Sequence, residues 1–296
     1  MANTIVVGMD LSPQSMIALE EAVPIARHRG AKIVIVHAEP TPMYALGFEG
    51  MGQGLVAQVA KVNKAHLAEV RRVLADIEQR HRGQGVDISV SLHPDEANVA
   101  IVEAAEKFDA ELVVVGAHGI GAIDRLLIGS VSERVVRAAP CDVLVSQDRH
   151  PKGRYDRILV PTDYSATARK AVSVAQDLLS DDGTITLLHC CEMPPMMAGY
   201  YTGDILGEIE AQAVKRAEEI AAPLREAGIH VQVQTFRGPP AHSIGKVAED
   251  NDIVVIGSHG RRGLRRFFLG SVAEKTVRYA QCSVYVVRAP ESEEES

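Results

Sequence analysis

The chain carries one glycine-spaced motif twice, and this duplication limits its possible folds more than any other feature. The first copy reads Gly116-Ala117-His118-Gly119, then nine residues, then Gly129-Ser130-Val131. The second reads Gly257-Ser258-His259-Gly260, then nine residues, then Gly270-Ser271-Val272. Identical spacing in two places indicates two copies of one structural unit rather than two unrelated turns.

Each motif follows a short apolar run, 112–115 or 253–256, that is typical of a buried parallel strand. Glycines at the carboxyl end of such a strand permit positive φ and a close approach of the backbone to a ligand. Helices beginning at Ser130 and Ser271 would add unpaired N–H groups and a positive dipole end. An ordinary turn between a strand and a helix also uses glycine, but two identical copies favour an anion site, above all for phosphates.

The repeat extends over a whole domain in each half. The expected strands are 4–9, 32–36, 87–92, 112–115 and 143–146, then 157–162, 184–188, 230–236, 253–256 and 284–288. Helical patterns lie between them, at 55–80, 96–107, 205–226 and 241–250 and from Ser130 and Ser271. Ser12, with Pro13 after it, and Ser165 are expected N-caps of the helices that follow the first strands. This alternation predicts an α/β fold of doubly wound parallel sheets.

Length and composition fit two soluble domains. At the usual 100–200 residues per domain, 296 residues make about two, which we place at 1–148 and 154–290 around a polar linker at 147–154. The acidic tail 291–296 is expected to be disordered. The net charge of −8 argues against nucleic-acid partners. The absence of a long apolar run or a basic leader argues for a cytoplasmic protein without a membrane segment.

The four cysteines have no metal-ligand spacing. Cys141 and Cys282 stand at equivalent positions before the last strand of each half, and Cys190-Cys191 follows another strand. We expect structural thiols in a reducing compartment.

The chain resembles tandem universal stress proteins from about residue 3 to residue 289. The likeness rests on Gly-x2-Gly-x9-Gly-Ser in both halves, on Asp10 and Pro161-Thr162-Asp163 after the first strands, and on His37-Ala38 and His189-Cys190 after the second strands. In that family the intact motif marks the ATP-binding branch. The resemblance implies five-stranded sheets of order 3-2-1-4-5. It also implies pairing of domains through their fifth strands, either within the chain or in a homo-oligomer.

Roles at the nucleotide site follow from the same resemblance. Strand order switches between the first and fourth strands, so a crevice is expected beside Asp10 and Asp163. The family's aspartate lies near the ribose and metal, which implies Mg²⁺ here, although Asp is also a common helix cap. Ala38 and Cys190 would read the adenine edge through their backbone. Val115 and Ile256 would pack on the base, although a core would choose the same residue types.

The expected ATP-binding residues can be stated for each half. In the first half they are Asp10, Ala38, Val115, Gly116, His118, Gly119, Gly129, Ser130 and Val131. In the second half they are Pro161, Thr162, Asp163, Cys190, Ile256, Gly257, His259, Gly260, Gly270, Ser271 and Val272. The glycines would admit ribose and phosphates, and the serines would supply N–H and hydroxyl groups to the terminal phosphates.

The histidines are expected to bind or support rather than to catalyse. His118 and His259 lie inside the glycine loops, where no orienting carboxylate or nucleophile accompanies them. His37 and His189 are expected to satisfy backbone groups at strand ends.

Two loop features differ in what they predict. Four arginines, Arg261, Arg262, Arg265 and Arg266, border the second motif, whereas the first has Ile120, Gly121, Asp124 and Arg125. Guanidinium groups pair well with phosphate oxygens, so the second site should hold a triphosphate more tightly. The apolar segments 40–54 and 193–203 suit lids, partner surfaces or plain connections.

Three functions remain open from the sequence. The first is an ATP-binding regulatory protein of the stress response, and the second is a slow ATPase or autophosphorylating enzyme. The third is a scaffold with relic motifs. The chain lacks a phosphate-loop lysine, an assignable arginine finger and a water-positioning glutamine, which favours binding over turnover.

Overall fold

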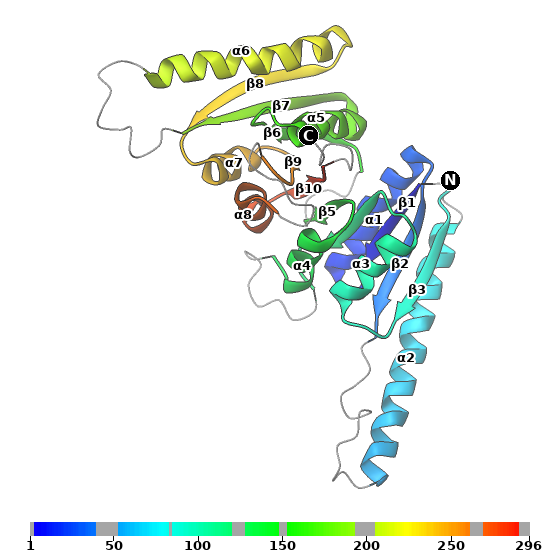
Figure 1. Cartoon of the computed structure of the whole chain (residues 1–296). Helices are drawn as coiled ribbons and strands as arrows, with labels where there is room; N and C mark the ends of the chain where they lie inside the picture. The colour runs from blue at the N-terminus through cyan, green and yellow to red at the C-terminus, as the bar shows by residue number, and fades with distance from the viewer. Residues whose placement is uncertain are drawn as a thin grey trace.

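The computed structural model describes residues 3–39, 53–82, 85–119, 128–147, 153–192, 205–260 and 269–289. Within them the chain forms one continuous ten-stranded sheet flanked by helices (Figure 1). Most of the expected linker, the acidic tail, most of the apolar segment 40–54 and all of the apolar segment 193–203 lie outside the described residues.

The elements follow the predicted order. The first half contains β1 (Thr4–Gly8), α1 (Pro13–Arg29), β2 (Lys32–Ala38), α2 (Gln53–Arg82), β3 (Ile88–His93), α3 (Ala97–Lys107), β4 (Leu112–Gly116), α4 (Ser130–Ala138) and β5 (Asp142–Ser146). The second half contains β6 (Tyr155–Pro161), α5 (Ala166–Leu178), β7 (Leu179–Cys191), α6 (Ile205–Glu226), β8 (His230–Arg237), α7 (Pro240–Ala248), β9 (Ile253–Gly257), α8 (Ser271–Tyr279) and β10 (Ser283–Val287). The main difference from the prediction is β7, which begins at Leu179 because that residue pairs with Tyr155.

The sheet order is β3-β2-β1-β4-β5-β10-β9-β6-β7-β8. Each half is therefore a parallel sheet of order 3-2-1-4-5, and the predicted fold class is confirmed. The halves join where β5 and β10 run antiparallel, with Leu144 opposite Tyr285. This pairing turns one half over relative to the other, so the carboxyl ends of their strands lie at opposite edges of the common sheet.

The predicted helix starts after the first strands are also confirmed. Ser12 and Ser165 have extended backbones, and their hydroxyl oxygens accept from the amides of Ser15 and Ala168. Pro13 occupies the first turn of α1, where a missing N–H costs nothing. These caps fix where α1 and α5 begin beside the carboxyl ends of β1 and β6.

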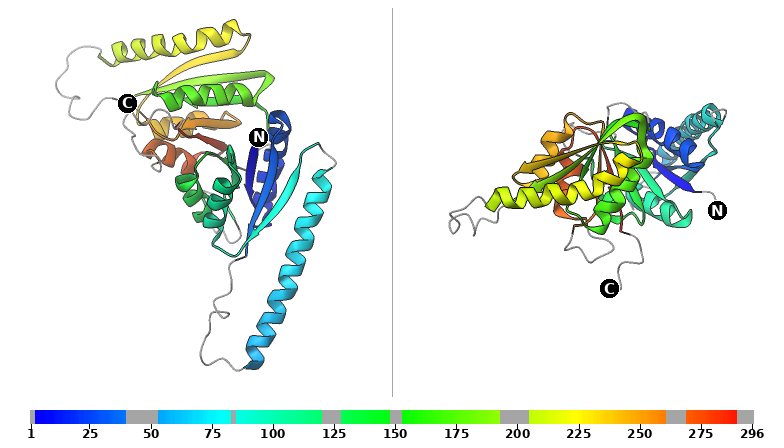
Figure 2. Two further views of the ribbon diagram at one scale, coloured as in Figure 1. Left: turned by 45° about the vertical axis from the view of Figure 1, so that its right-hand side comes forward. Right: turned by 90° about the horizontal axis from the view of Figure 1, so that it is seen from above.

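The helices cover the two faces of the sheet in alternation. Strand side chains point alternately to each face, so Ile5 and Val7 belong to the buried cluster on the face that carries α1, α2, α5 and α6. Val6 belongs to the buried cluster on the opposite face, which carries α3, α4, α7 and α8. Both buried clusters run through the two halves. Helices lie against both faces of the sheet in each half (Figure 2). Among the described helices, none is both long enough and apolar enough to cross a membrane.

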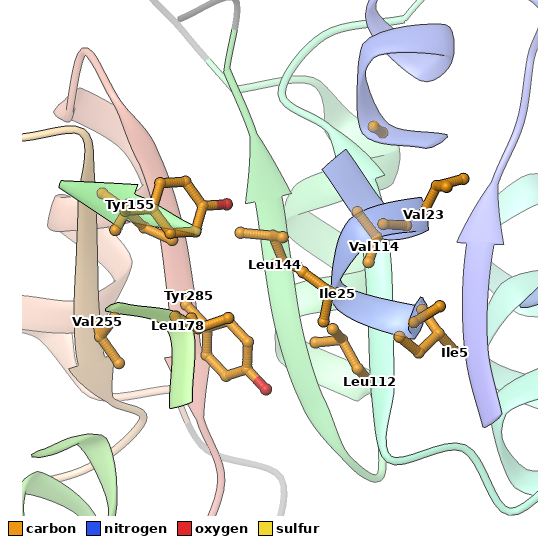
Figure 3. Close-up of a cluster of buried hydrophobic side chains, with 14 of the residues drawn as sticks. Ile5, Val23, Ile25, Leu112, Val114, Leu144, Tyr155, Leu178, Val255 and Tyr285 are labelled. Carbon is orange, nitrogen blue, oxygen red and sulfur yellow. The ribbon is translucent and has the colours of Figure 1, made fainter. Parts of the chain in front are cut away.

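Two buried tyrosines of the second half extend the core across the seam between β5 and β10. Tyr155 and Tyr285 lie beside Leu144 and Ile25 of the first half (Figure 3). The Tyr155 hydroxyl donates to Glu21 of α1, and the Ser283 hydroxyl lies 3.3 Å from the other oxygen of that carboxyl. The seam is thus an apolar core with a small polar network inside it.

Burial raises the pKa of Glu21, although hydrogen bonds from Ser146, Tyr155 and Ser283 partly oppose this effect. Folding therefore favours the protonated carboxyl. Its contribution to stability is complete below the unfolded pKa of 4.5 and is lost as pH rises through the folded pKa.

Glu21→Gln should remove this pH-dependent loss, since the amide stays neutral. We expect the stability of Glu21→Gln relative to wild type to increase with pH above about 4.5 and then level off, by about 1.4 kcal/mol per unit of pKa shift. Guanidinium unfolding between pH 4 and 8 measures this difference, with the exposed Glu20→Gln as the control. Parallel pH profiles of Glu21→Gln and wild type would contradict it.

Candidate functional site

A cavity of about 350 Å³ opens at the carboxyl edge of the first half, where the strand order switches between β1 and β4. The ends of β1, β2 and β4 form its floor, and α3 and α4 form its walls. Its lining includes every residue predicted for the first site: Asp10, Ala38, Val115, Gly116, His118, Gly119, Gly129, Ser130 and Val131. The duplicated motif and the strand ends therefore meet in one place.

The N-terminus of α4 faces this cavity without a side-chain cap. Gly129 is the N-cap residue and makes no side-chain cap hydrogen bond, and Gly270 has the same position before α8. This contrasts with α1 and α5, which serines cap. The first-turn amides of an α-helix have no acceptor within the helix, so those of α4 remain suited to an anion.

Asp10 lies at the edge of the cavity beside the glycine loop. Its Oδ1 accepts the amide of Ser12 at 3.0 Å. Its Oδ2 would lie 2.7 Å from a Cβ at Gly119, and the corresponding distance from Asp163 Oδ2 to a Cβ at Gly260 would be 2.5 Å. The alternative role of these aspartates, hydrogen bonding at the helix start, is therefore real, and it leaves the other oxygen next to the loop.

The expected positive φ at the motif glycines is wrong. None of the six, Gly116, Gly119, Gly129, Gly257, Gly260 and Gly270, has a positive φ. Glycine is required at two of these positions because a neighbouring helix leaves no room for a Cβ atom. A Cβ at Gly116 would lie 3.0 Å from the backbone of Gln14, and one at Gly257 would lie 2.7 Å from Thr167 Oγ1. These two glycines let α1 and α5 pack against the strand ends.

The left-handed backbone occurs one residue after each aspartate, at Leu11 (φ 63°) and Tyr164 (φ 66°). Non-glycine residues rarely adopt this conformation, and such strain gathers at functional sites. Here the left-handed residue turns the chain so that the aspartate carboxylate can accept the backbone amide of the N-cap serine that follows. The sequence has no glycine at either position, so it held no signal for this turn.

The second half repeats the arrangement with different side chains. Asp163 Oδ1 accepts the amide of Ser165 at 3.0 Å, and the Gly270 amide donates to Ser258 O at 2.7 Å. The remaining predicted residues stand at the matching strand ends and helix start: Pro161, Thr162, Cys190, Ile256, Gly257, His259, Gly260, Ser271 and Val272. The four loop arginines, with Ile120, Gly121, Asp124 and Arg125 of the first loop, lie outside the described residues.

Tyr164 distinguishes the second site most clearly. Its ring stacks on His189 with a centroid separation of 4.8 Å, and its hydroxyl donates to Ala213 O at 2.6 Å. It thereby ties α6 to the loop that carries Asp163. Leu11 stands at the matching position of the first half and has no hydroxyl, so α2 lacks this particular tie.

The histidines at the strand ends and in the glycine loops have two kinds of surroundings: His37 and His189 contact backbone carbonyl groups, and His118 lines the cavity. Nδ1 of His37 and Nδ1 of His189 lie 2.7 Å from the carbonyl oxygens of Met9 and Thr162, which confirms their backbone role. His118 lines the cavity, and its Nε2 is buried with no hydrogen-bond partner among the described residues. A buried polar atom of this kind beside an open cavity suits a ligand contact.

The cysteines are free thiols, as predicted. Burial raises the pKa of Cys141 to about 12 and that of Cys190 to about 11. At neutral pH both therefore stay protonated and are poor nucleophiles and poor metal ligands.

Several lining residues were not predicted. Met9, Ser15, Ala97, Ile101 and Ser132 also line the cavity. The Ser132 hydroxyl donates to Gly116 O at 2.6 Å and holds α4 against the end of β4. The Gly-Ser-Val-Ser run offered a signal for Ser132, whereas the α3 residues carry none because they belong to an ordinary apolar helix face.

The fold and the site together define a class of protein. Its members have two doubly wound domains in one chain, and each domain has one glycine motif at the point where the strand order switches. The family model described as "Universal stress protein family" matches residues 1–147 and 154–288. The chain therefore belongs to the universal stress protein family.

Relatives of full length support this assignment. A universal stress protein of Mycolicibacterium smegmatis is 27% identical over 293 residues, which cover 96% of both chains. One from Mycobacterium tuberculosis is 28% identical over 311 residues, covering 97% of this chain and 95% of that protein. A crystal structure from Archaeoglobus fulgidus, 21% identical, covers 98% of both chains with a TM-score of 0.67 and shares the fold.

Proposed function

We propose that this protein is an ATP-binding regulator of the stress response, with one Mg-ATP site at the carboxyl edge of each half. The observation that carries the proposal is the first-half cavity. It combines a glycine loop, an uncapped helix N-terminus and a carboxylate in about 350 Å³, within the range of small-molecule sites.

The residues present fit a nucleotide. Ala38 and Val115 offer a small, apolar surface for a base, and the glycine loop leaves room for ribose and phosphates. The α4 amides and the Ser130 hydroxyl suit the terminal phosphates, and buried His118 Nε2 supplies one more polar contact. Among the described residues that line this cavity, Asp10 is the only carboxylate, so it would hold Mg²⁺ together with phosphate oxygens.

Calorimetry of the full chain should detect two Mg-ATP per chain, with the second half tighter because of its loop arginines. Chelating Mg²⁺ should weaken both sites, and cyclic AMP, which lacks the terminal phosphates, should bind more weakly than ATP. Nucleotide extracted from denatured protein gives an independent stoichiometry. No saturable binding of ATP in either half would contradict the proposal.

Regulation rather than turnover is expected because the possible bases in the described lining of the cavity, His118 and Asp10, are assigned here to phosphate contact and Mg²⁺. We expect phosphate release at or below about one per minute, against a median enzyme rate of roughly ten per second. ATP should instead change hydrogen exchange in 40–54 and 193–203, or self-association. Rapid turnover abolished by Ser130→Ala or Ser271→Ala, with exchange unchanged, would favour an enzyme.

A further inference from the structure

A second group of possible ligands lies beside the first half, outside the nucleotide cavity. His93 ends β3, Asp95 follows it in the loop, and Glu103 lies on α3. One ligand atom from each lies within 4.8 Å of the others. We propose that these three side chains form a site for a divalent transition metal of the zinc class.

The charges at this corner are unbalanced. Among the described residues, neither Asp95 nor Glu103 has a basic partner within ion-pair distance. Carboxylates brought together without a cation repel one another, and a bound divalent ion would relieve this repulsion.

The donor set selects the class of metal. An imidazole nitrogen with two carboxylate oxygens suits Zn²⁺ and its neighbours, whereas Mg²⁺ and Ca²⁺ prefer oxygen ligands alone. Nε2 of His93 lies 3.1 Å from the Ser91 hydroxyl. When Nε2–H donates to that hydroxyl, Nδ1 presents its lone pair, and the ring is oriented as in typical metal-binding histidines.

The site is separate from the nucleotide cavity. Ile101 of α3 lines the cavity, and Glu103 stands two residues further on, about 200° around the helix. Metal binding would tie the β3–α3 loop to the outer side of α3, whose first residue, Ala97, lines the cavity. Because His93, Asp95 and Glu103 do not line the cavity, metal binding at these residues does not require bound ATP.

The second half provides an internal comparison. The two halves can be aligned through these helices, because α3 begins at Ala97 and α7 begins at Pro240. In this alignment Ile244 of α7 corresponds to Ile101 of α3, and both are buried. The same offset puts Phe236, Gly238 and Lys246 where the first half has His93, Asp95 and Glu103. None of these three residues is a common zinc ligand, so one metal per chain is expected.

Titration of the metal-free full chain with Zn²⁺ alone, without nucleotide, tests the proposal. Calorimetry should give one tight equivalent whose Kd weakens at least about tenfold in Glu103→Gln and in Asp95→Asn. Glu106→Gln removes an exposed carboxylate from the same helix outside the group and should bind as wild type does.

A second measurement separates loss of metal from loss of fold. The altered side chains are exposed, so circular dichroism and the metal-free Tm should match wild type. Zn²⁺ should raise the Tm of wild type and of Glu106→Gln, and a chelator should reverse the rise. Equal Zn²⁺ affinity in wild type and in both ligand variants, or no tight equivalent in wild type, would overturn the proposal.

Discussion

Gly119→Val should abolish one of the two proposed Mg-ATP sites, with at least about a hundredfold weaker binding, or about 2.7 kcal/mol. A Cβ at this position would lie 2.7 Å from Asp10 Oδ2, so valine must displace the carboxylate or the loop. The loop backbone would then no longer reach the phosphates. Calorimetry should report one remaining site, and Gly260→Val should remove the other for the same reason at Asp163.

The control for these variants is another glycine. Gly245 lies in α7, and a Cβ added there would meet open space, so Gly245→Ala should leave both sites intact. Gly119 is exposed and its φ is not positive, so the melting temperature of Gly119→Val should stay near that of wild type. Normal folding with two unchanged sites would mean that these glycines serve the turn alone.

Asp142→Ala should destabilise the protein by about 3–5 kcal/mol, because it removes a carboxylate charge that acts on the buried Arg288 and the acceptor of the Arg288 amide. Asp142 is 7% exposed and accepts from Lys170 Nζ at 3.1 Å and from the Arg288 amide at 2.8 Å. All three residues meet at the seam between the halves. Guanidinium unfolding measures the loss.

Asp181→Ala serves as the matched control, since its side chain is 94% exposed and pairs only with Arg154 in the described part of the chain. It should change stability by no more than about 0.5 kcal/mol. Equal unfolding midpoints for the Asp142 and Asp181 variants would show that the seam does not need its ionic group.

Much of the fold follows from local patterns. The apolar runs became strands, and Ser12 and Ser165 cap the helices at the predicted residues. The partner of the fifth strand does not follow from such patterns. Tyr285 lies opposite Leu144 because of contacts between distant segments, and only the family resemblance pointed to this pairing.

At the site, motif spacing and the sheet switch point were enough to bring nine predicted residues to one cavity. Conformation was harder to predict than position. The glycine at 116 provides room for Gln14 rather than a left-handed turn, and that turn falls on Leu11 instead. Glu21 and Asp142 were hidden for a related reason: charged residues suggest a surface, and only the assembled seam shows that they are buried.

The covalent link between the halves frees their interface from self-complementarity. In a homodimer with this β5–β10 geometry, every contact of residue i with residue j would occur a second time as j with i, so both sides of the two-fold axis would have to present the same side chains. Here Asp142 holds the amide of Arg288, while Ser283 at the matching position holds that of Gln147. One chain can thus place an acid at one of two equivalent positions and an alcohol at the other, and each half can diverge against a permanent, non-identical neighbour.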